Sequence, residues 1–331
     1  MKGIYFFSLL LISIWSGAQA PDSISAQVIE QHVRVLASDS LRGRGNHHPA
    51  QALATRYIAS RFQAYGLVPF PFFPGYQQPF SFVAGKVAPL DTAGAELNSL
   101  HNVVGMLKGK TWPNEIVLVS AHYDHVGVEQ KGRGDSILNG ANDNASGTAA
   151  MLELARYFAL RGDNERTLMF CAFGGEEMGL LGSRLVAKML RPEQVITVIN
   201  IEMIGLPQYG KNRFSLTGAY YSDLARFIDD RTKGGVTKRV REGADEKKLF
   251  YRSDNYPFAA RGVPAHTIMS SDDDDRCYHS TCDEGSRLDY AHMQNLVRTM
   301  AAALVPIVQG TFTPRRIKAG RLERYGFNVD D

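Results

Sequence analysis

Short apolar runs alternate along the chain with longer segments in which apolar residues recur at helical spacing. The runs 115–121, 167–173 and 195–201 are almost continuously apolar, which is typical of strands buried on both faces of a sheet. The segments 147–160 and 181–190 lie between them and have the composition of helices. A strand–helix–strand–helix–strand order favours parallel pairing through crossover helices. The pattern therefore predicts an α/β fold with helices on both faces of a central sheet.

Further elements are predicted on either side of these segments: helices over 25–36, 47–65, 222–233 and 288–308, and strands over 101–107, 213–217 and 265–269. The segment 68–82 is rich in proline and phenylalanine, so we expect irregular chain that leads into an edge strand. No repeat and no linker between two cores is visible in the sequence. We therefore expect one domain over residues 21–310, followed by a basic tail over 311–331.

The amino-terminal residues have the layout of a secretory signal peptide. Lys2 precedes an apolar run from Ile4 to Trp15, and small residues of a cleavage site follow at Ala18 and Ala20. The run of about 12 residues is short for a membrane span, although an uncleaved anchor is the alternative. We expect residues 1–20 to be removed, leaving a periplasmic or secreted chain without stable membrane insertion.

Composition and charge narrow the function only slightly. The 331 residues include 37 basic and 34 acidic side chains, for a formal net charge of +3, and 44% of them are hydrophobic. This near-neutral balance gives no electrostatic reason to expect a nucleic-acid partner. The sequence does not indicate an oligomeric state. The function must therefore be inferred from the positions of particular polar residues.

Polar residues follow the carboxyl ends of three predicted strands. His122 and Asp124 follow the first strand, Glu176 and Glu177 the second, and Glu202 the third. Ligands bind at this edge of open α/β sheets, although each acidic residue alone would suit a solvated loop. Side chains two residues apart face the same way in extended chain. Asp124 is therefore expected to accept a hydrogen bond from the second ring nitrogen of His122.

Loops supply two more candidate ligands. Asp143 lies on a Gly/Asn turn before a predicted helix, where a helix cap is the ordinary interpretation of one aspartate. His279 lies between Cys277 and Cys282, which favour a short disulfide in an oxidising compartment, with a zinc site using both thiols as the alternative. Two histidines and three carboxylates suit a pair of zinc ions with a bridging carboxylate, and one carboxylate is left over as a base.

The motifs around these residues resemble those of the secreted zinc aminopeptidases of metallopeptidase family 28, which has relatives among glutamate carboxypeptidases and glutaminyl cyclases. The matching motifs come in the family's order and are Ser120-Ala-His-Tyr-Asp124, Gly140-Ala-Asn-Asp-Asn-Ala-Ser-Gly147, Gly175-Glu-Glu-Met-Gly-Leu-Leu-Gly-Ser183, Asn200-Ile-Glu-Met-Ile-Gly205 and Tyr278-His279. The resemblance implies a three-layer sandwich with a mixed, mostly parallel sheet. It also implies hydrolysis of peptides that carry a free amino terminus.

The resemblance assigns a role to each candidate ligand of a di-zinc site. It implies that Asp143 bridges the two zinc ions, that His122 and Glu202 complete one site, and that Glu177 and His279 complete the other. Glu176 would then be the general base that takes a proton from a water bridging the metals and hands it to the leaving amine.

Other residues near these motifs are candidates for substrate contacts. Tyr251, Phe258 and Tyr278 are expected to line a substrate pocket that favours an apolar first residue, and the tyrosines are candidate donors to an oxyanion. The acidic cluster 272–275 is expected to be a solvated turn, with calcium binding or attraction of a substrate amine as alternatives.

The chain departs from the family's usual pattern at two positions. Glu202 stands where the family usually has Asp, so its longer side chain is expected to alter metal affinity or preference at that site. Asn255 stands where the family usually has His. Because this position is not one of the five ligands, we expect an effect on the pocket rather than a loss of chemistry.

Three other functions remain as alternatives. A glutaminyl cyclase-like aminoacyltransferase would use a single zinc ion, and a noncatalytic binding protein would use the same scaffold without turnover. A carboxypeptidase acting on acidic dipeptides would need a basic pocket, for which Arg252 and Arg261 are candidates. A serine hydrolase is disfavoured because the sequence has no Gly-x-Ser-x-Gly motif.

Overall fold

A computed structural model of the protein describes residues 24–46, 48–83, 86–88, 99–129, 134–240, 248–318, 320 and 322. The expected signal peptide and the end of the basic tail lie outside the described residues. The helices are α1 (Ala26–Leu36), α2 (Gln51–Ala64), α3 (Ser146–Arg161), α4 (Leu181–Met189), α5 (Leu224–Thr232), α6 (Tyr256–Ala259) and α7 (Tyr290–Val308). The strands are β1 (Val68–Pro69), β2 (Gln77–Val83), β3 (Lys86–Ala88), β4 (Ser99–Leu107), β5 (Trp112–His122), β6 (Gly127–Val128), β7 (Ile137–Leu138), β8 (Arg166–Phe173), β9 (Val195–Ile201), β10 (Arg213–Leu216), β11 (Lys238–Arg239) and β12 (Ala265–Met269).

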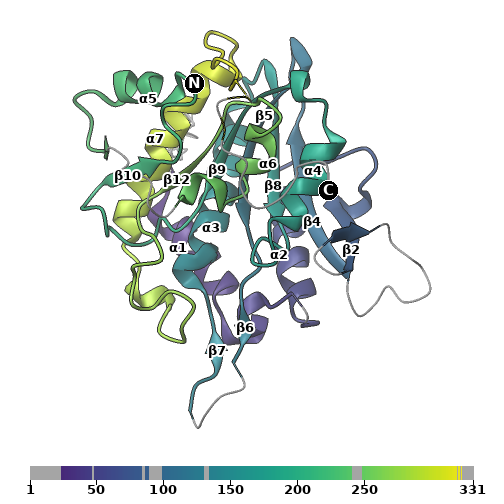
Figure 1. Ribbon diagram of the computed structural model, residues 1–331, viewed down its shortest axis with the longest axis vertical. Helices are drawn as coiled ribbons and strands as arrows, with labels where there is room; N and C mark the ends of the chain where they lie inside the picture. The colour runs from purple at the N-terminus through teal and green to yellow at the C-terminus, as the bar shows by residue number, and fades with distance from the viewer. Residues whose placement is uncertain are drawn as a thin grey trace, which may run out of the picture.

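A ten-stranded mixed sheet crosses the middle of the described part of the molecule (Figure 1). Its strands follow the order β11-β10-β12-β9-β5-β8-β4-β2-β3, with β1 paired to β4. The central strands β12, β9, β5 and β8 are parallel, whereas β10, β4, β2 and β3 join by antiparallel pairing. The expected α/β fold is confirmed, with its parallel pairing concentrated at the centre of the sheet.

Helices cover both faces of the sheet, as the continuous apolar runs predict. Alternate residues of β5 enter different hydrophobic clusters: Val117 and Val119 pack on one face, and Ile116 and Leu118 on the other. Helices α1, α2, α3, α5 and α7 contribute to the first cluster, and α4 and α6 to the second. Because both faces of these strands are covered by apolar side chains, a polar side chain within a strand would be buried without water. The polar side chains of a site are therefore expected at the ends of the strands.

The first residues of the basic tail continue onto the domain. Ile317 is buried in the second hydrophobic cluster, and its backbone N–H donates to the carbonyl of Gly262 at 3.1 Å. Arg315 pairs with Asp223 at 3.0 Å. The described part of the tail is therefore anchored by both apolar and polar contacts.

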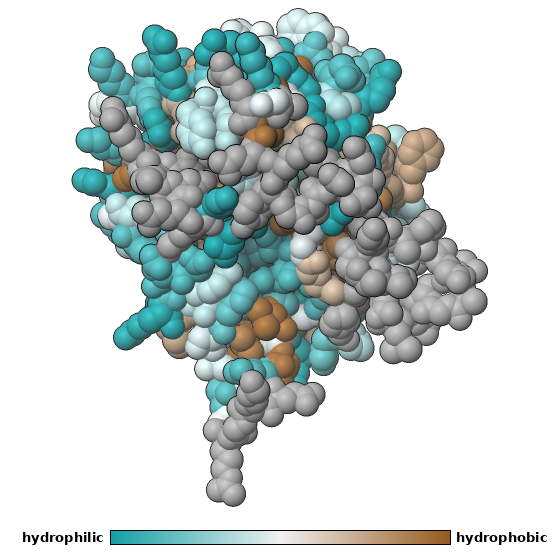
Figure 2. Space-filling model, in the orientation of Figure 1, coloured by the Kyte–Doolittle hydropathy of each residue, from teal (hydrophilic) through white to brown (hydrophobic). Residues whose placement is uncertain are grey.

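Figure 2 shows a mostly hydrophilic face on which hydrophobic side chains gather only in small patches. Among the described residues, no helix has the length and apolar character needed to span a bilayer.

A hairpin of β6 and β7 extends from the body at the bottom of Figure 1.

Candidate metal centre

The carboxyl ends of three parallel strands bring the predicted ligands to one edge of the sheet. His122 ends β5 and lies in register with Phe173, the last residue of β8. Two glycines then turn the chain before Glu176, and Gly175 has a φ of 73°, a left-handed conformation that favours glycine. Glu202 follows β9 directly and its backbone N–H donates to Ile268 in β12. Parallel pairing thus places these side chains together.

One set of possible ligand atoms forms what we call the four-residue group, which consists of His125, Asp143, Glu177 and His279. The Nδ1 atom of His125 lies 3.1 Å from Glu177 Oε1 and 3.6 Å from Asp143 Oδ2. The Nε2 atom of His279 lies 3.1 Å from each of the same two oxygens. Both imidazoles therefore face both carboxylates.

A second set forms the three-residue group, which consists of His122, Glu176 and Glu202. One ligand atom from each of these residues lies within 4.8 Å of the others. Asp143 lies between the two groups, because its Oδ1 is 3.4 Å from His122 Nε2 while its Oδ2 faces the four-residue group. The structure thus brings together all six residues expected at a di-zinc site, and adds His125.

Hydrogen bonds from neighbouring loops hold Asp143 in place. The carboxylate of Asp283 accepts from the backbone N–H groups of Asn142 and Asp143 at 2.9 and 3.0 Å. The guanidinium of Arg44, which is fully buried, donates to the carbonyls of Asn139 and Gly140 at 2.6 and 2.8 Å. The turn that carries Asp143 is therefore fixed by buried polar contacts at both ends.

The role of Asp124 differs from the one predicted. The backbone carbonyl of Asp124, rather than its carboxylate, lies 3.2 Å from His122 Nδ1, and the nearer carboxylate oxygen is 3.8 Å away. The carboxylate instead accepts from the backbone N–H groups of Glu176 and Glu177 at 3.2 and 3.3 Å, and from Asn46 at 2.7 Å. Strand β5 ends at His122, so the alternation of an extended chain does not continue to Asp124.

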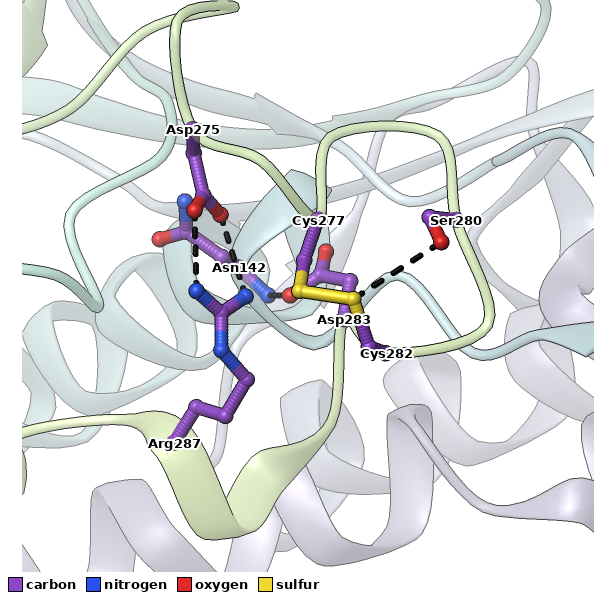
Figure 3. Close-up of a disulfide and its surroundings, with 7 residues drawn as sticks. All are labelled: Asn142, Asp275, Cys277, Ser280, Cys282, Asp283 and Arg287. Atoms are coloured by element: carbon purple, nitrogen blue, oxygen red, sulfur yellow. Dashed lines mark hydrogen bonds and ion pairs between the residues drawn. A yellow bond between two sulfur atoms is a disulfide. The ribbon is translucent and has the colours of Figure 1, made fainter.

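A disulfide between Cys277 and Cys282 closes the loop that carries His279 (Figure 3). This is the pairing that the sequence favours over a zinc site using both thiols. Figure 3 also shows Arg287 paired with Asp275 at 2.8 Å beside this loop. The described part of the loop is thus tied down on both sides of His279.

The two groups differ in their electrostatics. Burial raises the pKa of Glu176 well above its ordinary value, and the nearby Glu202 and Glu177 raise it further against the effect of His122. Burial likewise raises the pKa of Glu202 to about 7. In the four-residue group burial works in the same sense on Asp143, but the adjacent histidines outweigh it and hold the pKa of Asp143 well below its usual range.

The carboxylates of the site, and a buried ring nitrogen that has no hydrogen-bond partner among the described residues, are suited to bind divalent cations. His122 Nε2 is buried and makes no hydrogen bond to any described residue, although it faces Asp143. Buried carboxylates with raised pKa values are costly unless they are protonated or bound to a cation. Imidazole nitrogens and carboxylate oxygens are donors that zinc accepts. The residues present therefore suit zinc ions in both groups.

A pocket with about 400 Å³ of empty space opens beside these groups. Its lining includes Glu176 and Tyr278, together with the apolar side chains of Met203, Leu249 and Met269. Tyr278 was predicted to line the pocket, and its ring stacks on His279 with 3.9 Å between centroids. The pocket thus combines a half-buried acid with an apolar wall.

The other two residues predicted for the pocket lie in the core, so that prediction is wrong. Phe258 is buried in the second hydrophobic cluster against Phe173, with 6.3 Å between ring centroids. Tyr251 is also buried there, among Phe250 and Tyr256. Apolar packing explains both aromatic side chains.

The model of the family described as peptidase family M28 matches residues 102–304, which include nearly all of this centre. The chain belongs to peptidase family M28. The matched segment begins in β4 and ends within α7, so it contains the three strands that deliver His122, Glu176 and Glu202.

Curated relatives of the family carry peptidase names. Aminopeptidase YwaD of Bacillus subtilis is 29% identical over 246 residues, which cover 70% of this chain and 50% of the relative. Leupeptin-inactivating enzyme 1 of Streptomyces exfoliatus is 26% identical over 275 residues, which cover 72% of this chain and 57% of the relative. The chain therefore spans about half the length of the curated relatives that it matches.

Solved structures of family relatives share the fold. The zinc aminopeptidase BSAP of Bacillus subtilis superposes with a TM-score of 0.66 at 17% identity, covering 88% of this chain and 97% of that one. The glutaminyl cyclase of Porphyromonas gingivalis superposes equally well, with a TM-score of 0.66 at 15% identity, covering 87% and 100%. The fold alone therefore does not separate the two activities.

The two departures from the usual family pattern have different surroundings. Glu202 points into the three-residue group, and its Oε2 accepts a hydrogen bond from the hydroxyl of Ser253. Asn255 is buried and does not line the pocket. Its side chain donates to the carbonyl of Phe250 at 3.2 Å and accepts from Thr267 at 2.8 Å. The expected effect of Asn255 on the pocket would thus be indirect.

Three polar residues near the centre were missed by the sequence analysis. His125 joins the four-residue group, Asp283 positions Asp143, and the buried carboxylate of Asp254 adds negative charge near Glu176. A second histidine three residues after His122 was a visible signal for His125. Asp254 directly precedes Asn255, which the sequence analysis compared with the family pattern, and Asp283 follows Cys282, but neither aspartate was itself singled out as a candidate.

Side chains from other parts of the chain contact the acidic cluster 272–275. Asp272 accepts hydrogen bonds from Gln208 and Tyr209 at 3.0 and 2.9 Å. Asp273 lies in the pocket lining and pairs with Arg252 at 2.9 Å. Calcium binding there stays a prediction. Arg252 pairs with an aspartate, and the Arg261 side chain donates to the carbonyl of Ala187 within α4. This pair therefore does not form a strongly basic pocket.

Proposed function

We propose that this chain is a zinc aminopeptidase that holds two zinc ions and uses Glu176 as its general base. The observation that carries the proposal is the position of Asp143, which offers one carboxylate oxygen to each of two adjoining donor groups. A bridging carboxylate between two sets of nitrogen and oxygen donors suits a two-metal site. The peptidase names of the curated relatives support the same class of reaction.

Zinc ions in such a site supply Lewis acidity and lower the pKa of water toward neutrality. The protein's own contribution is then to move protons and to exclude solvent. Glu176 lines the pocket, and burial raises its pKa, so its carboxylate is suited to accept a proton from an attacking water near neutral pH. The same carboxyl group then returns the proton to the departing amine.

The backbone around Glu176 keeps this base in position. The N–H groups of Glu176 and Glu177 are both held by the carboxylate of Asp124, and the preceding glycines allow the sharp turn out of β8. A base fixed in this way loses little freedom when the substrate binds. Tyr278 lines the pocket, and we expect its hydroxyl to donate a hydrogen bond to a developing oxyanion.

The pocket also indicates which end of a peptide it receives. Among the described residues, its lining holds four carboxylates, those of Asp143, Glu176, Glu202 and Asp273, against the single guanidinium of Arg252, which favours a protonated amino terminus. Met203, Leu249 and Met269 provide an apolar wall for the first side chain. We therefore expect substrates with a free amino terminus and an apolar first residue.

The test measures metal content together with hydrolysis of a panel of aminoacyl chromogenic substrates. We expect two zinc equivalents in the wild type, fastest turnover for apolar first residues, and a fall in kcat of roughly 10²–10⁴-fold in Glu176→Gln with zinc retained. Glu193→Gln, at an exposed position in a surface turn, is the matched control and should behave as wild type.

Two results would change the assignment. One zinc equivalent with cyclisation of amino-terminal glutamine would make the protein a glutaminyl cyclase, whose solved examples share this fold. Zinc binding without turnover of either substrate class would leave a binding protein on a peptidase scaffold. The presence of a second complete donor group beside Asp143 is our reason for preferring the hydrolase.

The predicted extracytoplasmic location also remains part of this proposal. The disulfide between Cys277 and Cys282 supports it, because disulfides persist mainly in oxidising compartments.

A further inference from the structure

His125 is the member of the four-residue group that the resemblance to the family does not assign. Its side chain is 1% exposed, and its Nδ1 atom faces the space between Glu177 and Asp143. The His125 ring is confined on two sides. Gly140 lies so close that a Cβ added there would be 2.5 Å from His125 Cδ2, and the His279 ring packs edge-on with 5.3 Å between ring centroids. The orientation of the His125 ring is therefore set by the fold.

The four donor atoms form a closed cycle in which nitrogens and oxygens alternate. The successive distances from His125 through Glu177, His279 and Asp143 back to His125 are 3.1, 3.1, 3.1 and 3.6 Å. Zinc–ligand bonds of about 2.0–2.2 Å place the donors of a tetrahedral site about 3.3–3.6 Å apart. The cycle therefore has nearly the dimensions of a tetrahedral zinc site with four protein ligands.

Hydrogen bonding alone satisfies this arrangement poorly. A ring nitrogen carries at most one proton, which lies in the ring plane and points in one direction. Yet His125 Nδ1 faces two carboxylate oxygens, and His279 Nε2 faces the same two. A cation at the centre of the cycle would contact all four atoms at once.

We propose that His125 Nδ1 is the fourth protein ligand of the zinc ion held by Asp143, Glu177 and His279. This inference rests on the proposed di-zinc function. It gives the zinc ion of the four-residue group four protein donors, whereas Asp143, His122 and Glu202 would give the other ion three. The two ions would then differ in how tightly they are held.

The competing role for His125 is to donate one hydrogen bond to Glu177 and so only position that ligand. His125→Asn separates the two roles, because the asparagine amide N–H can replace an Nδ1–H donor but cannot supply an imidazole ligand. His125→Ala removes both functions. His292→Asn is the matched control, since His292 is also a fully buried histidine whose Nε2 has no partner among the described residues, and it lies outside both groups.

The experiment uses the zinc-loaded protein and does not depend on activity. Competition with a chromogenic chelator should show one tight and one weaker ion in the wild type and in His292→Asn. Both His125 variants should lose the tight phase, with affinity lower by about 100-fold or more, because even outer partners of ligands contribute 10–100-fold. X-ray absorption should report three imidazoles for two zinc ions in the wild type and two in His125→Asn.

Different results would overturn different statements. Wild-type affinity and an unchanged imidazole count in His125→Asn, with loss only in His125→Ala, would reduce His125 to a positioning residue. Two zinc ions with two imidazoles in the wild type would refute the inference while leaving the proposed aminopeptidase intact. Absence of bound zinc from the wild type would refute the proposed function itself. A thermal midpoint measured for each variant shows that the chains compared are folded.

Discussion

The two donor groups share Asp143 but differ in their balance of charge. The four-residue group sets two histidines against two carboxylates, and these atoms pair with one another at 3.1–3.6 Å. The three-residue group sets His122 against Glu176 and Glu202, and the buried carboxylate of Asp254 adds further negative charge nearby. The first group is close to neutral when its histidines are protonated, whereas the second has an excess of buried acid.

The pKa directions show what this difference does. In the four-residue group burial works to lower the pKa of His279, but its hydrogen bonds to Asp143 and Glu177 raise that pKa to about 10. In the three-residue group burial raises the pKa of Glu202 to about 7, and burial also raises the pKa of Asp254, which lies near this group, to about 7. Without metal, Asp143 and His279 keep their charges by pairing with each other, whereas the raised pKa of Glu202 favours its protonation.

Replacing Asp143 by Asn should have the largest effect, because this residue serves both groups. Asp143→Asn removes a buried negative charge that faces His122 on one side and His279 on the other. We expect loss of at least one zinc equivalent and a fall in kcat/KM of roughly 1,000-fold or more, since metal catalysis supplies several kcal/mol. Metal analysis and steady-state kinetics on one protein sample measure both effects.

Asp283→Asn is the matched control for this prediction. Asp283 is also buried, but it contacts the backbone N–H groups of Asn142 and Asp143 rather than the donor atoms. Its replacement should weaken zinc binding by about 10-fold, as expected for a partner one step removed from the metal. Two tightly bound zinc equivalents and normal turnover in Asp143→Asn would refute the shared role of Asp143.

The metal-free protein should become less stable as the pH rises from 6.5 to 9, above the range in which the buried His32, His266 and His292, whose pKa values burial lowers to about 4, have the opposite effect. Glu202 and Asp254 have folded pKa values of about 7, above the ordinary values of 4.5 and 3.8, so the folded state binds more protons than the unfolded state in this range. The stability that protonation provides is present below the unfolded pKa values and is lost as the pH rises through about 7. The raised pKa of His279 acts in the same direction at higher pH.

Calorimetry of chelator-treated and zinc-loaded protein at several pH values checks this. The thermal midpoint of the metal-free form should fall by several degrees between pH 6.5 and 9, while zinc should reduce the fall because bound cations replace the protons. Glu202→Gln, which cannot ionise, should give a flatter curve without metal. A metal-free midpoint that rises with pH would show that the three-residue group does not carry excess acid.

Much of this centre was predictable because its polar residues directly follow apolar runs that can be recognised in the sequence as buried strands. The apolar runs that became β5, β8 and β9 identified buried strands, and parallel pairing then placed the residues after them at one edge. Asp143 and His279 could be added because their loops match family motifs. The strand pattern therefore predicted which residues meet.

The finer geometry depends on where the chain leaves regular structure. Asp124 was expected to contact His122 through its carboxylate, but the strand ends at His122 and the carboxylate turns to the Glu176–Glu177 backbone. Tyr251 and Phe258 were expected in the pocket. The sequence around an aromatic residue near a loop is the same whether the residue packs in the core or lines a pocket. Long-range packing, which places both in the second hydrophobic cluster, decides between them.

Removing the disulfide should have the smallest effect and should act on one group alone. Cys277 and Cys282 are only five residues apart, so opening this loop costs at most about 2 kcal/mol of stability in the chain-entropy model. The double replacement Cys277→Ser with Cys282→Ser should lower the zinc affinity of the four-residue group, by about 10-fold, because the loop carrying His279 becomes less ordered. The weaker ion should be released into chelator at its wild-type rate, since no member of the three-residue group lies on this loop. If the double replacement accelerated the release of both zinc ions equally, the two groups would respond as a single unit. The difference in charge balance would then not define two independent sites.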